Sequence, residues 1–98
     1  MMKLSSRSKP KERRMAYKII IEKRIIKILA EIDEPYHSAI EKALYNLSNN
    51  PRPGGYKKLK GRDGYRIRVG YYRIVYDILD KMLIVKILTI GNRKDVYD

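Results

Sequence analysis

The stretch YRIRVGYYRIVYD, residues 65–77, constrains the possible fold more than any other part of the sequence. Apolar and polar residues alternate on both sides of Gly70, and a period of two is typical of β-strands with one buried face. If Gly70 and Tyr71 form a two-residue turn, the strands pair as a hairpin in which Arg68 lies directly opposite Arg73. Directly opposed side chains point to the same side of a sheet, so both arginines would share one face.

Arg66 belongs to the same predicted face, because side chains two positions apart on a strand point the same way. Like charges opposite each other are unfavourable by a few tenths to ~1 kcal/mol, so this arrangement favours an anionic ligand. A guanidinium group binds phosphate through two parallel hydrogen bonds and stays charged at any working pH. The alternative is that these arginines only keep a solvent-facing surface polar, or pair with acids such as Asp77.

Two helices are predicted ahead of this hairpin. Residues 16–22 are short and β-branched, which favours a first strand. Pro35 suits the first turn of a helix, and this helix should end near residues 49–51 because the residue before a proline avoids the helical region. Apolar residues recur with helical spacing in two stripes: Ile25, Ile28, Leu29 and Ile32, then Ile40, Ala43, Leu44 and Leu47.

The second half of the chain predicts a loop and three strands. Residues 49–64 are rich in proline, glycine and basic residues and read as the main loop. Helices that precede a meander of strands predict an α+β fold, β-α-α-β-β-β, with an antiparallel sheet packed against two N-terminal helices. The strands of the meander are expected over 65–69, 72–78 and 83–90.

Composition excludes several function classes. The chain has 98 residues, no cysteine and a single histidine, His37, so disulfides, thiolate metal sites and multi-histidine metal sites are excluded. The longest apolar run, residues 82–90, is interrupted by Lys86 and is far shorter than the roughly 20 residues of a membrane helix. We therefore expect a soluble cytoplasmic protein without a membrane partner.

The formal net charge of +12 favours a polyanionic partner, and nucleic acid is the commonest polyanion in a cell. Solubility alone is the alternative. Residues 1–14 carry six basic residues and one acid, hence five of these charges, and have the composition of a disordered basic arm. The remaining +7 belongs to a single predicted domain over residues 15–98.

Three segments in order, NPRPGGYKKLKG, YRIRVGYYRIVYDI and GNRKDVY, resemble the RelE family of type II toxins, in the RelE/ParE superfamily. The likeness covers residues 15–98. The resemblance implies an mRNA interferase, an endoribonuclease that enters the ribosomal A site and cuts the mRNA there without metal or cofactor. The partners it implies are the mRNA, the ribosome with its rRNA, and a RelB-like antitoxin that wraps and neutralises the toxin.

The resemblance also implies a catalytic set, formed by Arg66, Arg68, Arg73, Arg93 and Tyr97. Metal-free RNA cleavage uses the 2′-hydroxyl as nucleophile, and it needs charge stabilisation and two proton transfers. The hairpin arginines would hold the phosphate, Arg93 would stabilise developing charge, and Tyr97 would move protons if nearby arginines lower its pKa from about 10. Some relatives have lysines where Arg66 and Arg68 stand, and a guanidinium group cannot serve as a base.

Contacts with the backbone of ribosomal or messenger RNA are predicted for four basic residues of the loop: Lys57, Lys58, Lys60 and Arg62. A solvated loop is the alternative for them. Two other functions stay open, a ParE-like inhibitor of DNA gyrase and a catalytically inactive RNA- or ribosome-binding module. The presence of both Arg93 and Tyr97 argues against the gyrase inhibitor, since a protein inhibitor has no use for an acid–base pair.

Overall fold

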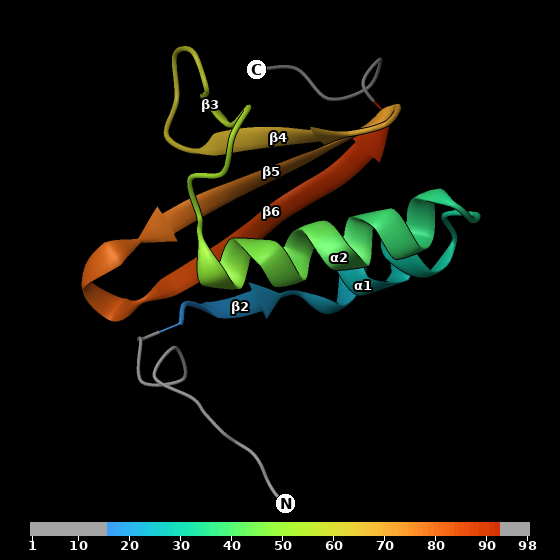
Figure 1. The fold of residues 1–98 in the computed structure, drawn as a ribbon, viewed down its shortest axis with the longest axis horizontal. Helices are drawn as coiled ribbons and strands as arrows, with labels where there is room; N and C mark the ends of the chain where they lie inside the picture. Colours follow the sequence, from blue (N-terminus) through green and yellow to red (C-terminus); the bar gives the residue numbers. More distant parts are fainter. Residues whose placement is uncertain (1–15, 93–98) are drawn as a thin grey trace, which may run out of the picture.

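Two helices and a five-stranded sheet form the part of the chain that the computed structural model describes, residues 16–92 (Figure 1). This arrangement confirms the predicted α+β fold. In chain order the elements are β2 (Lys18–Ile21), α1 (Lys23–Ala30), α2 (Tyr36–Asn49), β3 (Lys57–Lys58), β4 (Tyr65–Val69), β5 (Tyr72–Leu79), a short 3-10 helix (Asp80–Met82) and β6 (Ile84–Asn92).

The sheet has the strand order β2-β6-β5-β4-β3 and differs from the predicted sheet in two details. First, β2 runs parallel to β6, whereas the other neighbours are antiparallel, so the sheet is mixed. β2 and β6 are separated in the chain by both helices and the other three strands, so no tight turn joins them and forces an antiparallel pairing. Second, β3 adds a two-residue edge strand within the segment that was expected to be a loop.

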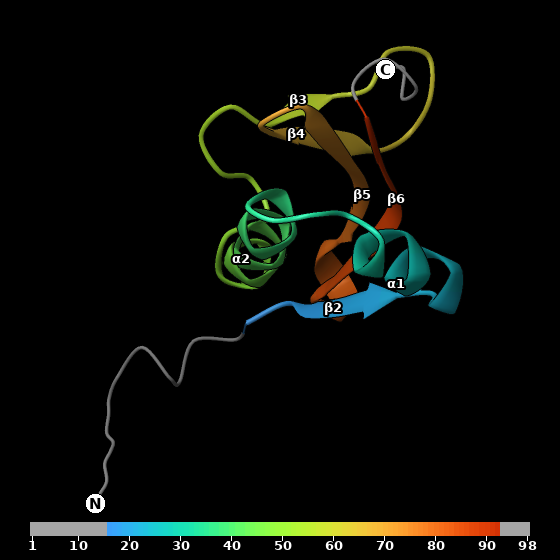
Figure 2. The ribbon, with the colours of Figure 1, turned by 90° about the vertical axis from the view of Figure 1, so that its right-hand side faces the viewer.

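One hydrophobic core joins both helices to one face of the sheet. The predicted helical stripes supply its helical side, and alternate residues of β4, β5 and β6 supply the other side. The buried members of this core are Ile25, Leu29, Ile40, Leu44, Leu47, Ile67, Ile74, Tyr76, Ile78, Val85, Ile87 and Ile90. Figure 2 shows α2 lying against the side of the sheet that these residues line, between β4 above and β2 below.

The helix ends follow local chemistry. α1 stops at Ala30, before the last member of its predicted stripe, but Ile32 still packs against the core. α2 ends at Asn49, where the N–H of Asn50 donates to the carbonyl of Asn46 and Pro51 follows. Proline disfavours the helical conformation of the residue before it, as the sequence predicted.

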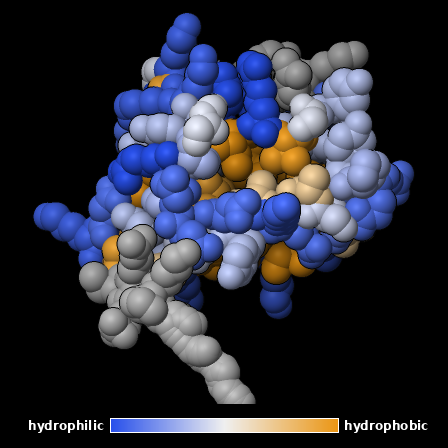
Figure 3. Space-filling view, viewed as in Figure 1, coloured by the Kyte–Doolittle hydropathy of each residue, from blue (hydrophilic) through white to orange (hydrophobic). Residues whose placement is uncertain are grey.

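A β-bulge divides β5 and β6 into two halves. Val75 pairs with Thr89, but the next residue, Tyr76, pairs with Ile87, so Leu88 is the extra residue of the bulge. Bulges increase local twist and re-aim neighbouring side chains. The half of β6 before the bulge, Ile84–Ile87, pairs with β2, whereas the half after it, Thr89–Asn92, pairs with the hairpin end of β5. Figure 3 shows apolar side chains between the hydrophilic β3–β4 edge and the hydrophilic surface of α2.

An ion pair ties three separate segments together. Arg52, after α2, donates from Nη1 and Nη2 to the carboxylate of Asp80 at 3.2 and 2.8 Å, and the hydroxyl of Tyr17 donates to the same carboxylate at 2.7 Å. The pKa of Asp80 is lowered by these hydrogen bonds, most of all by the one from Arg52. The hydrogen bond to Asp80 in turn raises the pKa of Arg52. The hydrogen bond to Asp80 also raises the pKa of Tyr17. The network fixes the loop after α2 against the β5–β6 connection.

Tyr76 holds the same loop from inside the molecule. Its side chain is fully buried, and its hydroxyl donates to the carbonyl of Pro51 at 2.7 Å. Burial raises the pKa of this phenol, so it remains a neutral donor under ordinary conditions. The segment that leads to β3 is therefore anchored at its start.

Candidate functional site

The hairpin formed by β4 and β5 has the register that its alternating sequence predicts. Arg68 pairs with Arg73 and Val69 pairs with Tyr72, so the turn consists of Gly70 and Tyr71. Gly70 has φ +60°, which suits the first central position of a turn that needs one residue with positive φ. The predicted convergence of arginines on one face follows directly from this pairing.

The arginine face is the side of the sheet opposite the helices, and it carries Arg66, Arg68 and Arg73. Arg66 is only 5% exposed and Arg73 only 9%, whereas Arg68 is exposed. Val75 pairs with Arg66 on this face and is fully buried, although it is not part of the main core. Attraction between a charge and an anion is screened less where water is displaced, so an anion that reaches Arg66 or Arg73 would be attracted more strongly than at an exposed side chain.

Strand β3 adds one lysine to the arginine face and sends the next lysine to the other face. Lys57 pairs with Arg66 and therefore points to the same side. Lys58 pairs with Tyr65, and its ammonium group lies over the ring of Tyr65 at 5.4 Å from the centroid. The four basic residues predicted to contact RNA thus do not form one surface.

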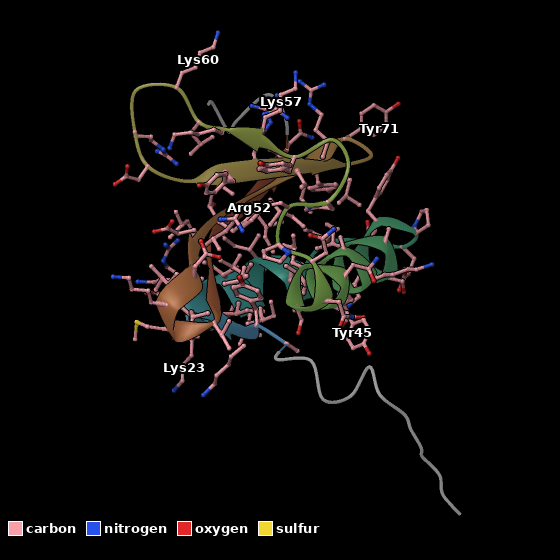
Figure 4. All side chains as sticks on the ribbon, turned by 60° about the vertical axis from the view of Figure 1, so that its left-hand side comes forward. Lys23, Tyr45, Arg52, Lys57, Lys60 and Tyr71 are labelled. Carbon is pink, nitrogen blue, oxygen red and sulfur yellow. The ribbon has the colours of Figure 1, made fainter. Side chains whose placement is uncertain are left out.

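The other two basic residues of that group lie in the loop between β3 and β4. Lys60 and Arg62 are both exposed, and Lys60 points away from the body of the molecule (Figure 4). The loop itself is anchored by Leu59, which is 3% exposed and whose N–H donates to the carbonyl of Gly64 at 3.0 Å. Neither Lys60 nor Arg62 belongs to a strand of the arginine face.

The remaining two members of the predicted catalytic set, Arg93 and Tyr97, lie outside the described residues. The last described residues of β6 are Gly91 and Asn92, and Gly91 pairs with Arg73. The described part of β6 thus ends beside β5, one of the two strands of the arginine hairpin. The role of these two residues stays a prediction.

Histidine and acidic side chains form no group of three or more that could hold a metal ion within residues 16–92. No helix in the same range is long and apolar enough to cross a membrane. Arg52 lies in the basic loop region but is engaged with Asp80 in an ion pair, so its contribution there is structural.

Comparison with known proteins places this fold and hairpin in a family. The family model described as ParE toxin of the type II toxin–antitoxin system parDE matches residues 14–97. The putative toxin RelE1 of Methanocaldococcus jannaschii is 31% identical over 87 residues, which cover 85% of this chain and 97% of that protein. The chain belongs to the RelE family of type II toxins. The family model gives the wider group, and the relatives carry the RelE name.

Two further relatives of this RelE-like toxin agree with that assignment. The mRNA interferase toxin RelE of Escherichia coli K12 is 28% identical over 88 residues, which cover 85% of this chain and 92% of that toxin. The archaeal RelE–RelB complex of Pyrococcus horikoshii contains a chain that is 28% identical and superposes with a TM-score of 0.73, covering 84% of the toxin and 100% of that chain. The resemblance stated from the sequence is therefore confirmed.

Proposed function

We propose that this toxin is a metal-independent endoribonuclease that cuts mRNA in the ribosomal A site. The observation that carries the proposal is the hairpin register, which brings Arg66, Arg68 and Arg73 to one face. The name mRNA interferase, borne by the similar toxin of Escherichia coli, supports the same reaction. Because ribosomes and translated mRNA are its targets, the toxin would act in the cytoplasm.

The proposed step is attack of the ribose 2′-oxygen on the adjacent phosphorus. A bond forms between that oxygen and phosphorus, the bond from phosphorus to the 5′-oxygen breaks, and the products are a 2′,3′-cyclic phosphate and a free 5′-hydroxyl. Arg66, Arg68 and Arg73 neutralise the pentavalent phosphate. Tyr97 takes the proton of the 2′-hydroxyl, and Arg93 stabilises the charge on the leaving oxygen, which collects a proton from solvent water.

Guanidinium groups are poor bases, so the division of labour follows from residue type. Arg66 and Arg68 stay protonated throughout and act only by charge and hydrogen bonding. Proton transfer then depends on Tyr97, whose pKa would fall from about 10 beside several arginines. A toxin of this kind should therefore lose the chemical step, and keep RNA binding, when the Tyr97 hydroxyl is removed.

We further propose that a RelB-like antitoxin is the partner that masks the arginine face. The similar toxin from Pyrococcus horikoshii forms a complex with RelB. The exposed side chains of Arg68 and Lys57 on the arginine face would attract RNA at any time, so an acidic segment that covers them would suppress toxicity.

The test is controlled expression followed by mapping of mRNA 5′ ends in translated and untranslated messages. We expect cuts within translated codons that disappear in Tyr97→Phe and Arg93→Ala and fall at least ~100-fold in Arg68→Ala, the loss expected for one transition-state donor. Arg24→Ala is the matched control, because Arg24 is an exposed arginine on α1 that pairs with Glu22.

Other outcomes would assign a different function. The wider family match has a ParE description, which keeps inhibition of DNA gyrase as the competing activity. Growth arrest with intact mRNA and broken DNA would contradict the ribonuclease proposal and support that activity. Binding to ribosomes without cuts in any message would instead indicate the inactive RNA-binding module.

A further inference from the structure

The turn of the arginine hairpin carries an exposed aromatic ring that the fold does not need. Tyr71 is 65% exposed and occupies the second position of the two-residue turn. Turn positions favour glycine, asparagine, aspartate, serine and proline, because these residues support the turn conformation or hydrogen-bond to the backbone. A tyrosine contributes neither effect, and its ring remains largely in water.

The ring of Tyr71 is nevertheless held in place. Tyr36, at the start of α2, contacts it edge to face with ring centroids 5.9 Å apart at 60°, and Tyr36 also packs against Tyr72 at 5.4 Å. Gly70 permits this contact, because a Cβ atom there would lie 2.6 Å from Cε1 of Tyr36. The aromatic cluster of Tyr36, Tyr71 and Tyr72 therefore orients a ring that is still open to solvent over most of its surface.

The position of Tyr71 relative to the arginines suggests a ligand. Tyr71 lies in the turn, two residues before Arg73, which pairs directly with Arg68. The hairpin therefore combines an oriented aromatic ring at its turn with guanidinium groups on its strands, and single-stranded nucleic acid is bound by such a combination, in which bases stack on rings and phosphates bind cations. Figure 4 shows Tyr71 at the same end of the molecule as Lys57.

We propose that Tyr71 is a stacking site for a base of single-stranded RNA whose phosphate is held by the Arg68–Arg73 pair. The inference rests on RNA being the substrate, as proposed above, but it does not depend on cleavage. The ring makes the site a binding position, and it takes part in no bond-making step. Stacking on a tyrosine is tolerant of sequence, so the site would fix the position of the RNA strand more than its sequence.

The chain offers a clean spectroscopic test because it contains no tryptophan. Tyr71→Trp creates a single fluorescent reporter at the turn, and Tyr45→Trp creates a matched reporter at a tyrosine that is 70% exposed on α2. The probe is a short 2′-O-methyl oligoadenylate, which has no free 2′-hydroxyl and is not cut. A second probe has the same number of phosphates but lacks the central bases.

We expect the fluorescence at position 71 to change with the oligoadenylate and to change much less with the abasic probe, while the reporter at position 45 is silent. Tyr71→Ala should bind the oligoadenylate about 5- to 150-fold more weakly, the range for loss of one stacked base, and Tyr71→Phe should bind like the wild type. Equal unfolding midpoints for these two variants establish that the hairpin is intact.

Two results would overturn the inference: a silent reporter at position 71, or equal responses to the two probes. Absence of any binding by the oligoadenylate counts against it in the same way. Loss of the proposed catalytic function has a different signature. If the catalytic proposal is wrong and the stacking proposal is right, the reporter responds to bases although no mRNA is cut in cells. If mRNA is cut but the reporter is silent, only the stacking proposal is contradicted.

Discussion

Neighbouring residues of the same type can have opposite roles, and Lys57 and Lys58 illustrate this. Their order on β3 sends Lys57 to the arginine face beside Arg66 and sends Lys58 to the ring of Tyr65. The sequence predicted both as contacts for RNA, because charge alone does not tell which face of a strand a lysine occupies. A two-residue strand has no alternation of apolar residues that would reveal its direction.

Replacement of each lysine by alanine should separate these roles. We expect Lys57→Ala to reduce the magnitude of the slope of log K against log salt concentration for single-stranded RNA by about 0.7, the value for one lost phosphate contact. Lys58→Ala should leave that slope unchanged, and lower stability by ~0.5–1 kcal/mol through loss of the contact with Tyr65. Titrations of a labelled oligonucleotide at several salt concentrations measure the slopes. Equal slopes for the two variants would argue against the face assignment.

The hairpin is the element that could be predicted most completely from the sequence. Alternation fixed the strand faces, and Gly70 fixed the turn, so the pairing of Arg68 with Arg73 could be predicted without any long-range information. The burial of Arg66 and Arg73 could not, since it depends on the loop and strands that surround them. The catalytic roles of Arg93 and Tyr97 rest on resemblance and stay predictions.

The pairing between strands that are distant in the chain could not be predicted from local sequence patterns. Periodicity gives the type of each element but not its neighbours, so the parallel alignment of β2 with β6 had no signature in the sequence. The bulge at Leu88 is a similar case, because one extra residue in a long apolar strand leaves its composition unchanged. Strand β3 was hidden by its length of two residues among prolines and glycines.

The connection between β5 and β6 should respond to acid through Asp80. Its pKa is lowered in the folded state, mainly by the hydrogen bonds from Arg52. A carboxylate of this kind stabilises the fold above its unfolded pKa of about 3.9 and loses that effect as the pH falls through the lower folded value. We expect the melting temperature of the wild type to exceed that of Asp80→Asn at neutral pH, and the difference to shrink below about pH 4.

A matched control for this measurement is Asp63→Asn, in the exposed loop before β4. The control should show no comparable change in the difference from the wild type as the medium is acidified. A gap between the wild type and Asp80→Asn that is constant from neutral pH to about pH 2 would contradict the stabilising role of the ion pair.

Considered as a whole, the toxin carries a formal charge of +12 and concentrates part of it on one face of the sheet. RNA and a masking antitoxin would then compete for the same cations. We expect the product of a neighbouring gene to co-purify with the toxin, and the complex to bind single-stranded RNA far more weakly than the free toxin does. Native gel shifts with increasing antitoxin measure the competition.

Two results would contradict competition between RNA and the antitoxin. A complex that binds RNA as tightly as the free toxin would place the antitoxin elsewhere on the surface, and failure to co-purify would remove the partner proposal. Arg24→Ala again serves as the control, because a change on the exposed side of α1 should not alter the competition.

The place of β6 in the sheet has a consequence for the folding of this toxin during its synthesis. In the described part of the chain, β6 is the strand that joins β2 to β5, yet it comes last in the sequence. β2 therefore cannot pair with β6 until almost the entire chain has been synthesised, and pairing between strands that are distant in the sequence is slow. If the toxin cuts mRNA on the ribosome, as proposed above, this order of synthesis would keep the nascent chain incomplete, and so inactive, while its own message is still being translated.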